Sequence, residues 1–213
     1  MRQSWLYDEV QSGDGENRMT ERVSHIAGRT PVLEDGRNLI DYYKLVEEEV
    51  IRGDLDARRV PLAIVCENFG HDINVAAVVR CANAFVASRI HICGRRKFDR
   101  RGTVGTHHYE HLEFAPDTAS VIGQYRDSGY CIVAVENVSG SVDMRSHVWV
   151  PNTLMIFGQE GTGITEESLA CADAVVSIPQ FGSVRSLNVG VAAGIAMYDY
   201  HMKLGFATAP GGL

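Results

Sequence analysis

The sequence predicts an α/β fold in which a mainly parallel sheet is covered by helices on both faces. From Val60 onward, short runs rich in valine and isoleucine alternate with segments of helical periodicity. Most of these runs are apolar nearly throughout, which is typical of strands buried on both faces. The predicted strands are Leu62–Cys66, Arg89–Cys93, Tyr130–Val135, Thr153–Phe157 and Ala174–Ile178.

Helical patterns lie between and after these runs, at Asn74–Val86, Asp117–Ser128, Glu166–Cys171 and Asn188–Lys203. Short polar side chains stand where each helix begins and can accept hydrogen bonds from its first N–H groups. We expect Asp72 or Asn74 to cap the first helix, Thr165 the third, and Ser186 or Asn188 the last.

The beginning of the chain differs from the rest. It contains one predicted amphipathic helix, Asn38–Arg52, which Gly53-Asp54 is expected to end. We therefore predict an N-terminal extension over residues 1–55 and an α/β domain over residues 56–213. The tail Ala207–Leu213 is expected to fray.

The charge is unevenly distributed. The formal net charge of −7 argues against a nucleic-acid partner, but residues 1–55 carry −5 of it and the remainder only −2. Within the remainder, five cations occupy seven positions around Phe98. They are Arg95, Arg96, Lys97, Arg100 and Arg101. The segment is interpreted either as a solvated loop or as a loop that binds phosphates.

Composition favours a cytoplasmic protein without a membrane segment. No apolar run approaches the ~20 residues that cross a bilayer, and the N-terminus has no apolar signal region. The cysteines are odd in number and form no CxxC pair, so we expect neither a disulfide framework nor a zinc site. They are Cys66, Cys81, Cys93, Cys131 and Cys171.

The first segment with chemical potential runs from Glu67 to Arg80, where a strand leads through a polar turn into a helix. Ligands of open α/β sheets bind beyond the carboxyl ends of the strands. Arg80 lies on an otherwise apolar helix and needs an anion, either in a structural ion pair or in a ligand. His71 is either a base or polar surface.

The second segment, Phe157–Ile164, is a glycine-rich turn. It lacks the Gly-Lys-Ser/Thr ending of a phosphate loop and the glycine spacing of a dinucleotide site. Glu160 would repel a pyrophosphate, so the turn suits a neutral or cationic ligand. The alternative is that its glycines serve only the backbone of a tight turn.

The third segment, Ile178–Gly194, is a strand end followed by a polar loop and a helix. Gly190 and Gly194 lie on one face of that helix, where each interior glycine costs about 1 kcal/mol relative to alanine. They predict very close contact with another backbone, and a tightly packed core helix is compatible with this.

The three segments contain the motifs N-x-x-x-x-x-R at Asn74–Arg80, G-x-E-G-x-G at Gly158–Gly163 and I-P-x-x-G-x-x-x-S-L-N at Ile178–Asn188. Together these motifs resemble those of the SpoU (TrmH) family of RNA ribose 2′-O-methyltransferases. This family belongs to the SPOUT superfamily, and the resemblance spans Leu62 to Lys203. It implies the SPOUT α/β-knot fold with a C-terminal trefoil knot, S-adenosylmethionine as cofactor, and a homodimer with its active site at the subunit boundary. The third motif looks closest to the branch that methylates the D-loop guanosine of tRNA.

The resemblance also assigns roles. It implies a catalytic function for Arg80, Ser186 and Asn188. It implies that residues 56–213 are the catalytic domain and that cofactor-binding positions are Val135, Gly158, Glu160, Gly163, Ile178 and Leu187. Without a recognisable RNA-binding domain in front, RNA recognition is expected from the extension, the five cations of residues 95–101 and the dimer surface.

The sequence departs from the family pattern at two places. Asn74-Val75-Ala76 replaces the commoner Asn-Ile-Gly, and Cys81 stands where threonine or serine is frequent. Neither change removes a reacting group. Arg80 is expected either to take the proton of the ribose hydroxyl or to bind a phosphate and stabilise developing negative charge.

Alternatives from other classes remain. The chain could methylate ribosomal RNA instead of tRNA, or be a catalytically silent knotted RNA-binding dimer. A metal enzyme built on His107, His108 and His111 is disfavoured because no matching carboxylate motif accompanies them. A Rossmann-type methyltransferase is disfavoured because no glycine-rich turn follows the first strand.

Overall fold

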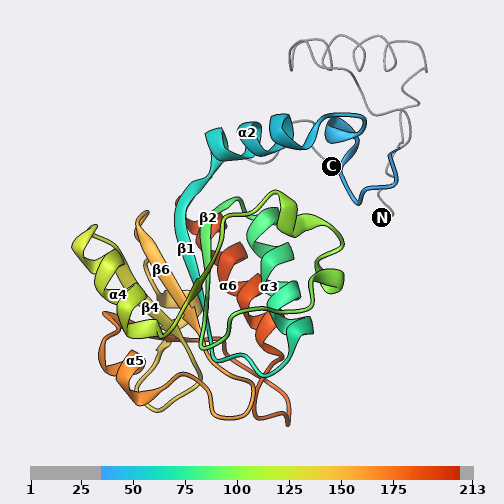
Figure 1. The fold of residues 1–213 in the computed structure, drawn as a ribbon. Helices are drawn as coiled ribbons and strands as arrows, with labels where there is room; N and C mark the ends of the chain where they lie inside the picture. The colour runs from blue at the N-terminus through green and yellow to red at the C-terminus, as the bar shows by residue number, and fades with distance from the viewer. Residues whose placement is uncertain (1–34, 207–213) are drawn as a thin grey trace, which may run out of the picture.

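The computed structural model describes residues 35–206, which form a seven-stranded sheet between two layers of helices (Figure 1). Every strand pair is parallel, and the strand order is β3-β2-β1-β6-β4-β7-β5. The strands are β1 (Val60–Glu67), β2 (Ala87–Cys93), β3 (Leu112–Ala115), β4 (Cys131–Val135), β5 (Val142–Asp143), β6 (Thr153–Phe157) and β7 (Ala174–Ser177). The predicted α/β class with a mainly parallel sheet is confirmed.

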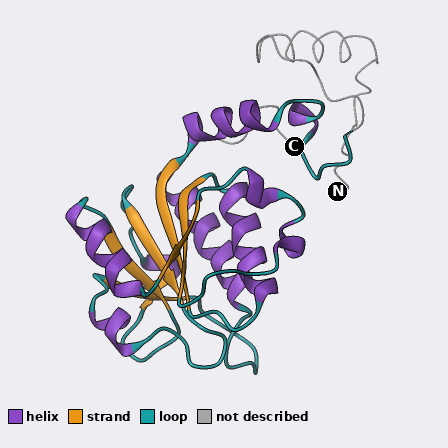
Figure 2. Ribbon diagram, viewed as in Figure 1, coloured by secondary structure: helices purple, strands orange, loops and turns teal. Residues whose placement is uncertain are grey.

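Helices cover both faces of this sheet (Figure 2). They are α3 (Asp72–Ala84) and α6 (Val189–Leu204) on one face, and α4 (Thr118–Asp127) and α5 (Glu166–Ala170) on the other. Side chains of β1 alternate between these layers. Leu62 and Ile64 pack in the cluster that contains α3 and α6, whereas Ala63 and Val65 pack in the cluster that contains α4. All four are fully buried, which explains the uninterrupted apolar run.

The two strands that the sequence did not predict, β3 and β5, lie at the edges of the sheet. Strand β5 has only two residues, Val142 and Asp143. In β3 the sequence Leu-Glu-Phe-Ala mixes a charge with apolar side chains, and no residue of this strand is buried. A strand with one neighbour and incomplete burial lacks the apolar run by which the central strands were recognised.

The predicted helix Asn38–Arg52 was wrong in both limits. The structure has a short 3₁₀ turn, η1 (Asp41–Tyr43), followed by α2 (Glu48–Arg58). Leu45, between them, has a φ of 63°, which interrupts the helical backbone. Helix α2 continues through Gly53 because Ile51 and Leu55 bury one face of it.

The predicted caps were partly right. Thr165 caps α5 by accepting a hydrogen bond from the Ser168 N–H. Asn188, not Ser186, caps α6 and accepts from the N–H groups of Gly190 and Val191. Neither Asp72 nor Asn74 caps α3, because both side chains are engaged elsewhere. The carboxylate of Asp72 accepts the Asp99 N–H at 2.7 Å, which fixes the loop after β2 to the start of α3.

The paired glycines of α6 make close contacts, but with side-chain atoms of α3 and not with another backbone as predicted. A Cβ added at Gly190 would lie 2.6 Å from the Cβ of Ala77, and one added at Gly194 would lie 3.2 Å from Sγ of Cys81. Ala77 and Cys81 are one turn apart on α3, so the two helices meet through a row of small side chains. The C-terminal knot stays a prediction.

The described part of the extension packs against the α/β domain. Tyr43, Val46, Ile51 and Leu55 form a small apolar cluster with Tyr109. Helix α2 crosses the boundary predicted between residues 55 and 56, and the division into two domains stays a prediction. The predicted frayed tail and residues 1–34 lie outside the described residues. Within 35–206, no helix is both long and apolar enough to span a bilayer.

Candidate active site

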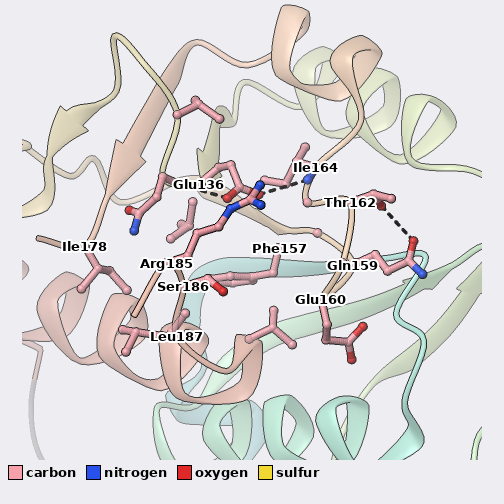
Figure 3. A pocket seen from close by; sticks show the side chains of 18 of the residues that line it. Glu136, Phe157, Gln159, Glu160, Thr162, Ile164, Ile178, Arg185, Ser186 and Leu187 are labelled. Atoms are coloured by element: carbon pink, nitrogen blue, oxygen red, sulfur yellow. Dashed lines mark hydrogen bonds between the residues drawn. The ribbon is translucent and has the colours of Figure 1, made fainter. Parts of the chain in front are cut away.

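A cavity of about 320 Å³ opens at the carboxyl ends of β4, β6 and β7 (Figure 3). Its walls are the segments that follow these strands: residues 135–138, residues 157–164, and residues 178–192 up to the first turn of α6. The strand ends of an open parallel sheet are where a ligand is expected. All six predicted cofactor-binding residues line this cavity, namely Val135, Gly158, Glu160, Gly163, Ile178 and Leu187.

The glycine-rich turn folds back on itself at the cavity wall. Gln159 and Gly163 form an antiparallel bridge, with N–H···O distances of 3.2 and 2.8 Å. A Cβ at Gly158 would lie 2.2 Å from the backbone of Gly163 and Ile164, so no larger residue fits. Gly163 has a φ of +75°, a conformation that L side chains rarely adopt. Backbone groups can therefore approach a ligand closely here.

Glu136 is a cavity residue that the sequence analysis missed. Its Oε2 accepts the Ile164 N–H at 3.1 Å and would lie 2.6 Å from a Cβ at Gly163. The carboxylate forms no ion pair with any residue between 35 and 206. A carboxylate without an ion pair in a cavity wall favours a ligand with a positive charge, although Arg185 also brings a cation to this cavity. Its position one residue after β4, at the carboxyl end of a predicted strand, could have identified it as a candidate site residue.

The mouth of the cavity carries further polar groups from the loop between β7 and α6. Gln180, Arg185 and Ser186 line it, and Figure 3 shows Arg185 and Ser186 on the side of Leu187. Oε1 of Gln180 is buried and has no hydrogen-bond partner within the described chain. A buried acceptor without a partner costs about 1–3 kcal/mol, so this oxygen suits a ligand that donates a hydrogen bond.

A chain of hydrogen bonds links the three motif segments beside the cavity. Nδ2 of Asn74 donates to Oε1 of Glu160, and Nδ2 of Asn188 donates to Oδ1 of Asn74 at 2.9 Å. The other carboxylate oxygen of Glu160 accepts the Gly70 N–H at 2.9 Å. The Glu160 side chain points away from the cavity centre (Figure 3). It therefore joins the glycine-rich turn to α3.

Burial alone raises the pKa of Glu160. Hydrogen bonds donated by Asn74 and by backbone N–H groups stabilise the charged form more strongly, so the net pKa lies below its ordinary value of 4.5. Glu160 is therefore a carboxylate at neutral pH.

The three residues predicted as catalytic are not brought into one cavity by a single chain. Ser186 lines the cavity, but Asn188 and Arg80 do not. Asn188 holds the start of α6 and contacts Asn74. Arg80 is exposed on α3 and forms neither a hydrogen bond nor an ion pair with the described residues. The expected alternative, a structural ion pair of Arg80, is not present within that range.

Only some of the cations of residues 95–101 are free of ion pairs. Arg95 pairs with Asp72 at 2.8 Å and Arg101 pairs with Asp99 at 2.5 Å. Arg96, Lys97 and Arg100 are exposed and form no ion pair with residues 35–206. These side chains lie outside the cavity, so their predicted role in binding RNA stays a prediction.

The histidines considered as metal ligands are engaged separately. His107 contacts Oγ1 of Thr103, and His111 contacts the carboxylate of Asp56 at 2.8 Å. No group of three histidine, cysteine, aspartate or glutamate side chains in the described chain is arranged to hold a metal ion. All five cysteines are free thiols.

Fold and cavity define a class of α/β protein: one parallel sheet with a cavity for a small ligand beyond its strand ends. The model of the SpoU rRNA Methylase family matches residues 61–198, which include the three motif segments and the cavity. The chain therefore belongs to the SpoU rRNA Methylase family.

Named proteins that are similar to this chain agree with this family assignment. The tRNA (guanosine(18)-2′-O)-methyltransferase of Escherichia coli strain K12 is 31% identical over 147 residues, which are 67% of this chain and 64% of that protein. The chain thus matches slightly less than two thirds of that relative. The A. aeolicus TrmH/SpoU tRNA modifying enzyme has a similar structure, with a TM-score of 0.68, 25% identity, and coverage of 74% of this chain and 82% of that one.

A second similar structure is the AdoMet-bound rRNA methyltransferase from Sinorhizobium meliloti. Its TM-score is 0.63 and its identity 27%, with coverage of 72% of this chain and 60% of that one. The fold predicted from the resemblance is thus found in enzymes named for tRNA and for rRNA.

Proposed function

We propose that the chain is an RNA methyltransferase that uses S-adenosylmethionine to methylate a ribose 2′-hydroxyl. The observation that carries this proposal is the cavity beyond β4, β6 and β7, built from the second and third motif segments of a SpoU family chain. The E. coli relative is named as a 2′-O-methyltransferase, and the S. meliloti structure is described as AdoMet-bound.

The cavity residues fit S-adenosylmethionine. The volume of about 320 Å³ lies at the lower end of the range for small-molecule sites. Glu136 supplies a carboxylate without an ion pair for a cationic ligand, and Oε1 of Gln180 supplies an unused acceptor for an amino or hydroxyl group. Gly158 and Gly163 keep side chains out of the wall. When bound, the cofactor supplies an electrophilic methyl group on a positively charged sulfur.

The protein must hold the ribose oxygen in line with that methyl group and ease the loss of its proton. We assign orientation of the hydroxyl to Ser186, which lines the cavity mouth. Asn188 is assigned as a positioning residue, because its amide is already bonded to α6 and to Asn74. A guanidinium holds its protons at neutral pH, so we assign to Arg80 the binding of an RNA phosphate and the stabilisation of negative charge on the oxygen.

We further propose a homodimer formed through α6. Val191, Ile195, Tyr198 and Met202 are exposed apolar side chains at i, i+4, i+7 and i+11 of this helix. Such a stripe on one helix face fits a second apolar surface. A dimer would also explain why Arg80 lies outside the cavity of its own chain, since a partner's Arg80 could complete the site.

Mixing two inactive variants tests this shared site. If Arg80 acts in the partner's cavity, combining Arg80→Ala and Ser186→Ala chains should restore about a quarter of wild-type activity, because half of the dimers are mixed and each has one intact site. No recovery in mixed dimers isolated by two affinity tags would contradict a shared site.

We propose tRNA as the substrate and a D-loop guanosine as the target, with ribosomal RNA as the alternative. Two of the three named relatives are enzymes of tRNA. The proposed place of action is the cytoplasm, which suits five free thiols.

The deciding experiment is to map 2′-O-methylation in tRNA and rRNA from cells that lack the protein. Wild type should restore the missing methylation and Asn188→Ala should not. Loss confined to rRNA would reject the tRNA target and leave the chemistry intact. Failure to bind S-adenosylmethionine in calorimetry would instead favour a silent RNA-binding dimer.

A further inference from the structure

A second cavity lies at the junction of the extension with the edge of the sheet, near the amino ends of β2 and β3. Its volume is about 260 Å³. Three separate parts of the chain form it: α2, the edge strand β3 with its neighbour β2, and the short 3₁₀ turns η2 (Arg100–Thr103) and η3 (Thr106–His108). Figure 1 shows α2 beyond the start of β1 and the segment after β2 beside α3. We refer to it as the α2–β3 cavity.

The lining of the α2–β3 cavity is strongly polar and rich in cations. Its residues are Arg52, Arg89, Arg100, His107, Glu110, His111, Leu112 and Glu113. Its two carboxylates already have partners. Glu110 is paired with Arg59 at 2.9 Å, and Glu113 is paired with Arg89. Acidic side chains around it are also engaged, since Asp56 pairs with Arg59 and His111.

Two guanidinium groups in this cavity remain uncompensated. Arg52 has only a 3.5 Å contact with Nδ1 of His111 and no ion pair with residues 35–206. Arg100 is exposed and has no ion pair within the same range. Guanidinium groups bind phosphate oxygens through several N–H donors, so two free ones facing one cavity favour a phosphate ligand.

The α2–β3 cavity is connected to α3, the helix that carries Arg80. Glu110, which lines it, accepts a hydrogen bond from Nδ2 of Asn83 at 2.7 Å. Arg80 precedes Asn83 by three residues, which is about 4.5 Å along a helix axis. A strand of RNA held by Arg80 would therefore reach this cavity within a few nucleotides.

We propose that the α2–β3 cavity binds backbone phosphates of the RNA next to the nucleotide that is methylated. This inference rests on the proposed function and extends it, because it gives a described part of the extension, Arg52, a place in RNA recognition. It also divides the basic segment of residues 95–101: Arg100 belongs to this site, whereas Arg95 and Arg101 are held by Asp72 and Asp99.

The test compares the double variant Arg52→Gln/Arg100→Gln with Arg126→Gln, a control on α4 outside the cavity, where Arg126 pairs with Asp173. The probe is an unmodified tRNA transcript. For the double variant we expect the RNA dissociation constant and the KM for RNA to rise about tenfold or more. The slope of log affinity against log salt should fall by about 1–2, as expected for the loss of one or two phosphate contacts. We expect kcat, the unfolding temperature and the affinity for S-adenosylmethionine to change little, and the control to behave as wild type.

An unchanged salt slope and RNA affinity in a folded double variant would overturn the proposal. Equal losses in the control would also overturn it, because they would show a general charge effect. In another outcome, inorganic phosphate raises the unfolding temperature of the wild type and not of the double variant, while both bind the transcript equally. That result would overturn the proposal and assign the cavity to a small anion. A wild-type chain that binds the transcript but transfers no methyl group would contradict the proposed function, and the salt-slope comparison would still decide this site.

Discussion

The amide of Asn188 donates a hydrogen bond to Oδ1 of Asn74 at 2.9 Å and joins two segments that are 114 residues apart. The direction of this bond is set from both ends. Glu160 is a carboxylate that can only accept, so it turns Nδ2 of Asn74 toward itself. At the other end the first turn of α6 offers only N–H donors, so it turns Oδ1 of Asn188 toward itself. The three motif segments therefore share one consistent network beside the candidate cavity.

Two substitutions of Asn188 separate its structural and positioning roles. Asn188→Ala removes the cap of α6 and leaves Asn74 without its donor, so we expect a loss of about 1–3 kcal/mol in the free energy of unfolding. Asn188→Asp keeps the cap but places a carboxylate against Oδ1 of Asn74. We expect a smaller loss of stability in this variant, yet a fall in kcat of about a hundredfold in both, as displaced reacting groups produce. Urea unfolding and single-turnover methyl transfer measure the two effects, and an active Asn188→Asp would show that the amide serves only as a cap.

The network predicts a pH dependence of stability. The pKa of Glu160 is lower in the folded chain than its ordinary value, so the folded state binds fewer protons at this site. The stability it contributes is fully present above a pH of 4.5, the ordinary pKa of this group, and is lost as the pH falls through the folded value. Glu160→Gln should therefore lower the free energy of unfolding at pH 7 and make less difference at pH 3. A difference that is equal at both pH values would mean that the charge of Glu160 is unimportant.

The contact between α3 and α6 predicts opposite effects for two glycine substitutions. Gly190→Ala places a methyl group 2.6 Å from the Cβ of Ala77, so the helices must move apart, and we expect a loss of about 1–3 kcal/mol. Gly123 lies exposed inside α4 with nothing within 4 Å of its added Cβ. Gly123→Ala should raise the free energy of unfolding by about 0.5–1 kcal/mol. Denaturant unfolding of both variants gives the comparison, and similar effects in the two would contradict a tight helix contact.

A buried guanidinium fixes the junction between α2 and the sheet. Arg59 donates to the backbone oxygens of Ala87 and Tyr109, both at 2.6 Å, and pairs with the fully buried carboxylate of Glu110. Burial raises the pKa of Glu110, and Arg59 opposes that rise. Removing one partner leaves the other charge buried, so Arg59→Ala should cost about 3–5 kcal/mol of unfolding free energy. Arg96→Ala, at an exposed arginine, should change it by less than about 0.5 kcal/mol, and equal effects would show that the ion pair contributes nothing.

The central strands could be predicted because β1, β2, β4, β6 and β7 are apolar enough to be recognised without knowing their neighbours. The same reasoning could not find β3, whose residues are only partly buried, or β5, whose two residues are ordered by pairing with β7. Glu136 was missed because it stands one residue beyond a recognised strand, in a segment without glycine. Its role is visible only when the Ile164 N–H from the neighbouring turn reaches its carboxylate.

Site residues were predicted most reliably where the backbone conformation requires a particular residue type. Gly158 and Gly163 were recognised because few residues other than glycine permit such a turn, and both line the cavity. Arg80 was predicted from the resemblance, but the single chain leaves it outside the cavity. If a second subunit completes the site, as proposed, the arrangement of one chain does not contain it.

The most direct test is transfer of a labelled methyl group from S-adenosylmethionine to an unmodified tRNA transcript by the purified full-length chain. A methylated ribose oxygen protects the adjoining phosphodiester from alkali, so the label should appear in an alkali-resistant dinucleotide. We predict this product for wild type and its loss in Arg80→Lys, with RNA affinity retained. Label in a base, or no transfer to tRNA or rRNA by a folded chain that binds the cofactor, would contradict the account.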